Sequence, residues 1–361
     1  MKTARLSTSE SLMLDVIRCV AAGAVAFGHL TQPFFSTGWP NLIFVARSAV
    51  AVFFLLSGFV IRYVTCRKPA TLGHYLGDRA SRIYSVAIPA LLFAYIADTI
   101  SLHVNPAFFE IWRSSYTHPF LNIAANLLFC GQLWAHIISP FTAGPFWSVN
   151  YEVAYYLLYG CWFYITGIQR WFWIVIISIV YGPRVLYLAP LWILGCGLHD
   201  LYQYWTNPDA STARSTALTV ASLGVLIAFF GIVCVRAAHG QTFGPAVFNH
   251  ISKVVNVRQT DYLFGLLWSF AFLLLLFIAR QFSLAQSATF VRAAHFISEG
   301  TFPIYLLHFP LYVLIASCIP YNHASSAQKL IIFFSVMTVG VLAGHPCNLL
   351  KLKIRSLIFR S

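Results

Sequence analysis

Long apolar blocks separated by short polar connections follow one another along the whole chain. Each block approaches the ~20 residues that a helix needs to cross the hydrocarbon core of a bilayer. The pattern therefore predicts an all-α polytopic membrane bundle of about ten transmembrane helices. The expected spans are approximately 12–30, 43–64, 83–102, 121–139, 148–168, 171–199, 215–235, 261–280, 301–319 and 328–346.

The block 171–199 is ambiguous, because it is long for one straight span and short for two. The sequence Gly182-Pro183-Arg184 inside it is typical of a kink, a tight turn or a broken helix. Basic residues cluster at the N-terminus, between the second and third blocks, and in the tail from Lys351 to Arg360. An even number of spans places all three clusters on the cytoplasmic side. We therefore predict ten spans, with 171–199 crossing once; eleven would put the basic tail outside.

The first block is expected to be a retained span, because Asp15 and Arg18 interrupt it and a cleaved signal sequence has an uncharged core. No internal repeat is visible, and no polar connection is long enough for a separate domain. We expect a single integral-membrane domain over residues 1–361.

Composition supports the membrane prediction and narrows the chemistry. Hydrophobic residues make up 59% of the chain and charged residues 9%, against roughly 25% charged residues in soluble proteins. The net charge of +13 comes from Lys and Arg in short loops, which favours topology signals over nucleic-acid binding. The eight cysteines are scattered singly without zinc spacing, so neither a metal site nor a disulfide framework is expected.

The first span carries two residues that are unusual in hydrocarbon, Arg18 and His29. A helix separates them by ~16 Å, close to three turns, so they share one face. An Arg near the cytoplasmic end suits a phosphate group, and a His deeper in the membrane suits a general base. A lone His of this kind is more often a hydrogen-bonded packing residue, but the shared face favours a site.

Glu152 lies inside an apolar, aromatic run from Phe146 to Tyr164. An ionisable side chain at this depth costs roughly 3 kcal/mol, so it needs either a function or a buried Arg as its partner. Ser57 and Gly58 lie in mid-span, where helix packing through small residues is the alternative to a site. His308 also lies inside a span, and packing and function are equally compatible with it.

Four arginines could form a basic vestibule at the cytoplasmic mouth, although single ones are expected as topology anchors. They are Arg18, Arg62, Arg79 and Arg82.

Four segments together resemble the acyltransferase-3 family of bacterial membrane proteins. They are Arg18 with His29, FFLLSGFVIR at 53–62, FWSVNYEVAYYLL at 146–158 and TFPIYLLHFPL at 301–311. Their order and spacing match from the first span to the tenth. Members of this family transfer acyl groups, usually acetyl, from cytoplasmic acyl-CoA to sugars of surface polysaccharides, lipopolysaccharide, lipo-oligosaccharides or small glycosides.

The resemblance implies that His29 is the catalytic histidine, that Arg18 is its partner, and that Glu152 is the acid of a Trp-Ser-x-x-x-Glu segment. Where the family often has Glu-x-Pro near its last span, this chain reads Gly344-His345-Pro346. That position is not expected to carry function. The chain resembles the stand-alone form without a hydrolase-like domain.

The resulting hypothesis is an O-acyltransferase of the bacterial inner membrane, with both termini cytoplasmic and acyl-CoA (acetyl-CoA) as co-substrate. It acts within the lipid bilayer on a carbohydrate acceptor, and neither a metal nor nucleic acid is expected to take part. The sequence is compatible with a monomer or a homo-oligomer. Direct transfer and a transient acyl-histidine are equally compatible with the sequence. The expected site residues are catalytic His29 and Glu152, CoA-binding Arg18, Arg62, Arg79 and Arg82, and substrate-binding Trp147, Ser148, Asn150, Tyr151, Ser57 and His308.

The competing hypothesis is a transporter or flippase for a glycan or small solute. A broken helix near 182–184 and intramembrane Arg, His and Glu residues would serve a substrate or proton pathway. The absence of a repeat and the clustering of charges in the N-terminal half favour the acyltransferase.

Overall fold

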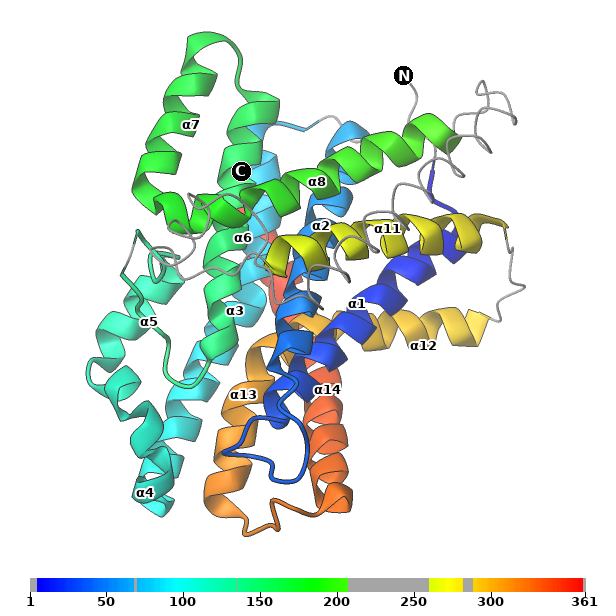
Figure 1. Ribbon diagram of the computed structural model, residues 1–361. Coiled ribbons are helices and arrows are strands. Elements are labelled where there is room, and N and C mark those ends of the chain that lie inside the picture. The colour runs from blue at the N-terminus through cyan, green and yellow to red at the C-terminus, as the bar shows by residue number, and fades with distance from the viewer. Residues whose placement is uncertain (1–4, 68–69, 135, 207–259, 282–287, 360–361) are drawn as a thin grey trace, which may run out of the picture. The chain divides into compact units, whose positions relative to one another are not determined.

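The computed structural model describes residues 5–67, 70–134, 136–206, 260–281 and 288–359, and every regular element in this part of the chain is a helix. Seven of the described helices are long and apolar enough to cross a membrane, which confirms the all-α polytopic prediction. The elements (Figure 1) are α1 Thr8–Leu30, α2 Ile43–Arg67, α3 Leu72–Val104, α4 Pro106–Phe109, η1 Glu110–Tyr116, α5 Pro119–Leu127, η2 Gly144–Phe146, α6 Trp147–Tyr164, α7 Gly167–Tyr181, α8 Pro183–Thr206, α11 Thr260–Gln281, α12 Ala288–Glu299, α13 Thr301–Cys318 and α14 Ser326–Ile358.

The chain forms two compact units, each assembled from distant segments. Unit 1 comprises Met1–Ile17, Ala51–Pro69 and Tyr187–Ala285, and unit 2 comprises Arg18–Val50, Ala70–Leu186 and Gln286–Ser361. Unit 2 therefore holds His29, Glu152 and His308, whereas Ser57 and Arg62 belong to unit 1.

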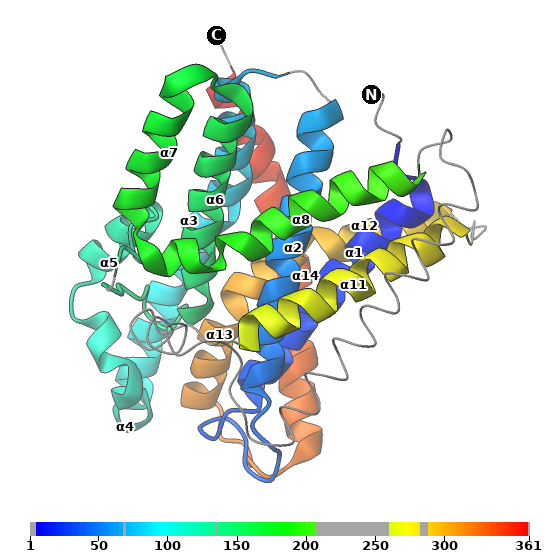
Figure 2. The same ribbon diagram turned by 45° about the horizontal axis from the view of Figure 1, so that its top comes forward.

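Helix α13 is the centre of unit 2. It packs against α3 and α14, and these two also pack on each other; α13 and α14 lie side by side in both ribbon views (Figures 1 and 2). Buried residues occur all around α13, from Thr301 to Ser317. A helix that is apolar on every face is expected to be enclosed by its neighbours. Helix α6 packs on α3, α7 on α6, and α12 on α14.

The basic start of α3 and the basic end of α14 lie at the same end of unit 2. Arg355 Nε donates to Asp78 Oδ1 at 2.8 Å, and the rings of His74 and Phe359 stack with centroids 4.4 Å apart. The tail that follows the last apolar block is helical as far as Ile358. The structure thus brings together two of the basic clusters that the charge pattern assigned to one side.

A buried lysine fixes the segment after α1 against the start of α14. Lys329 is fully buried, and its Nζ donates to the Thr37 carbonyl at 2.9 Å and to Ser36 Oγ at 3.2 Å. The same ammonium lies 4.1 Å from the centroid of the Trp39 ring. Because a buried cation is costly without partners, these contacts hold residues 36–39 in place.

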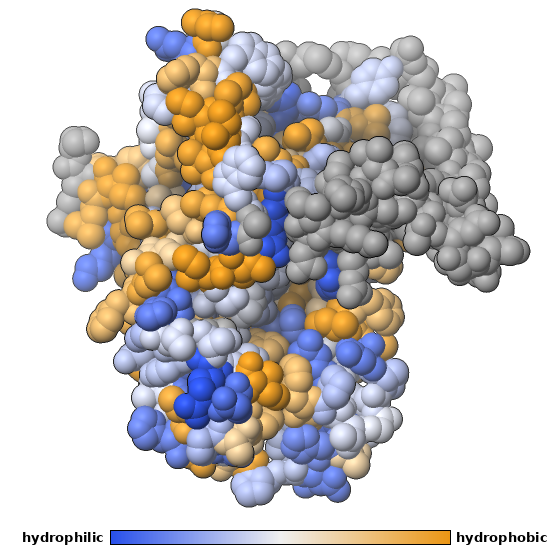
Figure 3. All heavy atoms as spheres, turned by 60° about the vertical axis from the view of Figure 1, so that its left-hand side comes forward, coloured by the Kyte–Doolittle hydropathy of each residue, from blue (hydrophilic) through white to orange (hydrophobic). Residues whose placement is uncertain are grey.

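The block 171–199 consists of two helices, so the break predicted at 182–184 is a turn between α7 and α8. Helix α7 ends at Tyr181 and α8 begins at Pro183; of the two, α8 is long enough to span. Gly182 between them has a φ of +79°, and a Cβ there would lie 2.8 Å from the Trp134 ring. Glycine is required for this turn. The outer face of α7 is strongly apolar, as the orange side chains near the top of Figure 3 show.

The expected span 121–139 is wrong. Only the nine-residue α5, Pro119–Leu127, is helical there, and irregular chain leads to η2. This chain is tied to α3 by the fully buried Asp98, whose carboxylate accepts from the Thr142 amide at 2.8 Å and from its hydroxyl at 2.6 Å. Hydropathy could not distinguish such a buried connection from a span. The expected span 215–235 lies outside the described residues, and α12 was not expected.

In unit 1, α2 and α8 approach each other through glycines. A Cβ at Gly58 would lie 2.1 Å from the Trp192 carbonyl oxygen, and a Cβ at Gly195 would lie 2.2 Å from the Leu55 carbonyl oxygen. Small residues allow this close approach. The packing interpretation of Gly58 is the one that the structure supports.

This contact predicts opposite effects for two glycine substitutions. Gly58→Ala should lower the free energy of unfolding by about 1–3 kcal/mol, because the new methyl group overlaps backbone. The matched control is Gly197→Ala in α8, where a Cβ would meet nothing within 4 Å. It should leave stability unchanged or raise it by roughly 0.5–1 kcal/mol. Thermal unfolding in detergent measures both; equal effects would contradict the proposed glycine contact.

Candidate functional site

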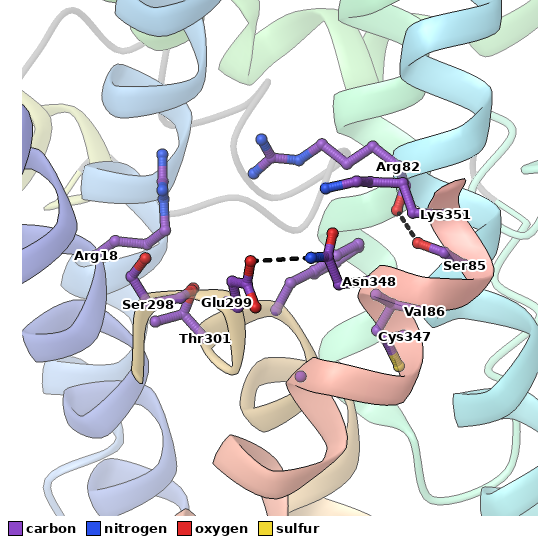
Figure 4. A pocket seen from close by; sticks show the side chains of 12 residues that line it. Arg18, Arg82, Ser85, Val86, Ser298, Glu299, Thr301, Cys347, Asn348 and Lys351 are labelled. Atoms are coloured by element: carbon purple, nitrogen blue, oxygen red, sulfur yellow. Dashed lines mark hydrogen bonds between the residues drawn. The ribbon is translucent and has the colours of Figure 1, made fainter. Parts of the chain in front are cut away.

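A cavity of about 190 Å³ lies inside unit 2 between α1, α3, α12, α13 and α14 (Figure 4). It forms where the basic end of α14 passes the junction of α12 and α13. Its polar lining residues are Arg18, Arg82, Ser85, Ser298, Glu299, Thr301, Asn348 and Lys351.

Positive charge dominates the lining of this cavity. Figure 4 shows Arg18 on one side and Arg82 and Lys351 on the other, with Glu299 between them. Three cationic side chains from three different helices thus surround a single carboxylate. Such a cavity attracts anions, and the arginines suit phosphate oxygens in particular.

The same cavity also offers hydrogen-bond acceptors. Asn348 Nδ2 donates to Glu299 Oε1 at 2.9 Å, and Asn348 Oδ1 is buried without a hydrogen-bond partner among the described residues. A ligand that combines negative groups with hydrogen-bond donors would use both properties. Sequence reasoning missed Asn348 and Glu299, and it treated Lys351 as part of a topology signal. Their proximity depends on the packing of α12 against α14.

Gly344 also lines the cavity, at the position where the sequence resemblance would place a Glu. A Cβ there would lie 2.7 Å from the Gly300 amide nitrogen. A side chain at residue 344 would therefore collide with the α12–α13 junction, so the carboxylate in this cavity comes from Glu299 instead.

Two histidines meet at the other end of α1. The rings of His29 and His308 lie with their centroids 5.2 Å apart, and Phe309 packs edge-on against His29 at 5.2 Å. His308 is fully buried, and its Nδ1 is 3.0 Å from the Ile304 carbonyl oxygen. The structure thus brings together two of the histidines that the sequence singled out.

Helices α1 and α13 connect the cavity with this histidine pair. Arg18 and His29 lie ~16 Å apart along α1, and Thr301 and His308 lie ~10 Å apart along α13. Both helices run from the cavity towards the pair.

Glu152 lies between α6 and α3 among other polar groups. The Tyr156 hydroxyl donates to its carboxylate, and the Arg79 guanidinium lies 5.9 Å from the centroid of the Tyr156 ring. The Arg82 side chain lies near the Tyr156 hydroxyl, and Glu152 lies near the Tyr305 hydroxyl in α13. The predicted residues Glu152, Arg79 and Arg82 therefore belong to one polar cluster.

Ser148 makes its contact with α13. Its Oγ shares a 2.6 Å hydrogen bond with the Tyr305 hydroxyl, which also donates to the Pro145 carbonyl at 3.1 Å. Beside it, the ring of buried Tyr151 packs edge-on against Trp147 with centroids 5.0 Å apart. Tyr305 was present in the TFPIYLLHFPL segment, but sequence reasoning assigned it no role.

The Asn150 side chain hydrogen-bonds to the backbone of two segments. Its Oδ1 accepts from the Gly131 amide at 3.1 Å, and its Nδ2 donates to the Phe146 carbonyl at 3.2 Å. The side chain is fully buried. It joins the start of α6 to the irregular chain after α5.

The two predicted site residues of unit 1 have partners within that unit. Arg62 binds Asp200 through Nε at 2.9 Å and Nη2 at 3.0 Å, and His199 Nδ1 lies 2.9 Å from the same carboxylate. Ser57 Oγ accepts from Trp192 Nε1 at 3.2 Å. The Arg62 guanidinium is therefore held by a carboxylate of its own unit.

Comparison with known proteins gives one match. A family model described as an acyltransferase domain matches residues 12–345, which include the histidine pair, Glu152 and most of the cavity lining. No curated protein and no solved structure gives a significant match.

Asn150→Ala should reduce stability rather than substrate binding. It leaves the Gly131 amide buried without its acceptor, at a cost of about 1–3 kcal/mol. Thermal unfolding in detergent, together with steady-state kinetics on the folded fraction, separates the two effects. If stability were unchanged and KM for the acceptor were raised, Asn150 would bind the acceptor as the sequence predicted.

Proposed function

The chain belongs to the acyltransferase-3 family, and we propose that it transfers an acyl group from cytoplasmic acyl-CoA to a hydroxyl group of a carbohydrate. The observation that carries this proposal is the basic cavity around Arg18, which α1 and α13 connect with the histidine pair. That arrangement suits a donor with phosphates at one end and a reactive thioester at the other.

The donor binds with its phosphates in the cavity. Arg18, Arg82 and Lys351 hold the phosphate groups, while Asn348 and Glu299 accept hydrogen bonds from the nucleotide. The pantetheine arm then follows α1 and brings the thioester to His29. Acetyl is the acyl group that we propose, because related proteins use it most often.

The transfer uses His29 as a general base. One ring nitrogen takes the proton from the sugar hydroxyl while the hydroxyl oxygen attacks the thioester carbon. A tetrahedral intermediate forms, and its collapse breaks the carbon–sulfur bond. The CoA thiolate leaves with the proton that His29 returns. In a two-step variant, His29 itself would carry the acyl group; thiol released before acceptor is added would identify that variant.

The acceptor is a carbohydrate of a surface polysaccharide, lipopolysaccharide or lipo-oligosaccharide. The protein lies in the bacterial inner membrane with both termini in the cytoplasm, because the basic ends of α3 and α14 mark one side. Trp147 and Tyr151 at the start of α6 are proposed to contact the acceptor.

The first test is the release of free thiol from acetyl-CoA by purified protein in nanodiscs, with surface glycans as acceptor. His29→Ala should reduce this release by at least about 10²-fold, because proton transfer from the hydroxyl loses its base. Detergent extraction and thermal unfolding confirm insertion and folding. Folded wild-type protein that releases no thiol with any acyl-CoA, yet moves solute, would favour the transporter hypothesis.

The second test addresses the cavity. Lys351→Ala should raise KM for acetyl-CoA by roughly tenfold, since a hydrogen bond to a charged group contributes about 1.5–3 kcal/mol. Lys353→Ala is the matched control, because Lys353 is exposed on the same helix and does not line the cavity. S-acetylpantetheine, which lacks phosphates, should show no difference between the two variants. Equal effects of both variants on acetyl-CoA would place its phosphates elsewhere.

A further inference from the structure

Buried polar atoms without hydrogen-bond partners gather around the catalytic histidine of the proposed reaction. Among the described residues near this ring, His29 Nδ1, Gln32 Oε1, His308 Nε2 and the Tyr312 hydroxyl are in this state. The rings of His308 and Tyr312 lie 6.0 Å apart between centroids, and those of His29 and His308 lie 5.2 Å apart. An unsatisfied buried polar group costs about 1–3 kcal/mol, so their concentration at one place requires an explanation.

The surroundings of His308 fix which of its nitrogens carries hydrogen. A carbonyl oxygen can only accept a hydrogen bond, so the 3.0 Å contact with Ile304 places a hydrogen on Nδ1 of His308. The ring is fully buried in an apolar helix, where the neutral form is favoured. Nε2 of His308 therefore presents a lone pair, which seeks a donor.

His29 needs an acceptor of this kind. To take a proton through Nε2, its imidazole must carry hydrogen on Nδ1, and a partner that accepts from this N–H holds the ring in place. The two rings are inclined by 42°. Rings at this separation are close enough for a hydrogen bond between one nitrogen of each, either directly or through one water molecule.

We propose that His308 is the positioning residue of His29. Its Nε2 accepts the hydrogen of His29 Nδ1, fixes the tautomer and orientation of the base, and stabilises the imidazolium that forms when the sugar hydroxyl gives up its proton. This inference rests on the proposed function. It makes His308, and not the predicted catalytic residue Glu152, the group that orients His29.

The other candidates for this role are less well placed. Glu152 accepts from Tyr156 and lies in the cluster with Arg79 and Arg82, and it reaches α13 at Tyr305, one turn before His308. Gln32 also lies beside the His29 ring, and its Oε1 is a buried acceptor, but it belongs to the connection after α1 and not to an enclosed helix. His308 comes from the enclosed helix α13, whose packing on α3 and α14 holds it rigidly.

The test compares a substitution that removes the ring nitrogens with one that keeps a hydrogen-bond acceptor. His308→Phe fills the space without a nitrogen, whereas His308→Gln keeps an acceptor near the position of Nε2. We expect His308→Phe to lower kcat by about 10²- to 10⁴-fold, with KM for acetyl-CoA and acceptor within about a factor of two. His308→Gln should recover kcat to within about tenfold of wild type. Glu152→Gln and Gln32→Leu, measured in parallel, should both reduce kcat less than His308→Phe.

The controls separate failure of this inference from failure of the proposed function. Unchanged acetyl-CoA binding and thermal unfolding show that a variant is folded; if His308→Phe does not fold, His308→Met replaces it. Wild-type activity that depends on His29 but survives His308→Phe would overturn the positioning role alone. A Gln variant as slow as the Phe variant, or a loss confined to KM for the acceptor, would also overturn it. Wild-type protein without any thiol release would instead overturn the proposed function.

Discussion

An unpartnered polar group in hydrocarbon costs free energy, and this cost determines how the buried ionisable residues of unit 2 are bound. Asp98 is held by Thr142, Lys329 by Thr37 and its neighbours, and each contact joins a helix to a connecting segment. The partner segments are irregular chain that a bilayer would otherwise exclude. Because breaking such a contact would leave a buried charge, these ionisable residues determine where the connections of unit 2 lie.

The same constraint helps to distinguish polar residues that stabilise the fold from polar residues that are available to a ligand. Asn150 was predicted to bind substrate, yet its side chain has partners on both sides and joins two parts of the backbone. Asn348 Oδ1, His29 Nδ1 and His308 Nε2 are buried and lack partners within the described residues. They lie at the basic cavity and at the histidine pair, which are the two places where the proposed donor would contact the protein.

Periodicity and local motifs predicted the features that depend only on residues close together in the sequence. The helices around 12–30, 43–64 and 301–319 are confirmed, because each needs only a continuous apolar run. The break at Gly182 was visible in the sequence, but its geometry depends on Trp134, which is distant in sequence. Lys351, Asn348 and Glu299 could not be grouped, since only the packing of α14 on α12 brings them together.

The separation of the cavity from the histidine pair has a consequence for the proposed reaction. Along α14, Lys329 and Lys351 lie ~33 Å apart, so the contacts of buried Lys329 and the cavity occupy opposite ends of the helix. Through Thr37 and Trp39, Lys329 fixes the segment that follows His29. Donor recognition and the surroundings of the base are therefore built from different ends of the same helices.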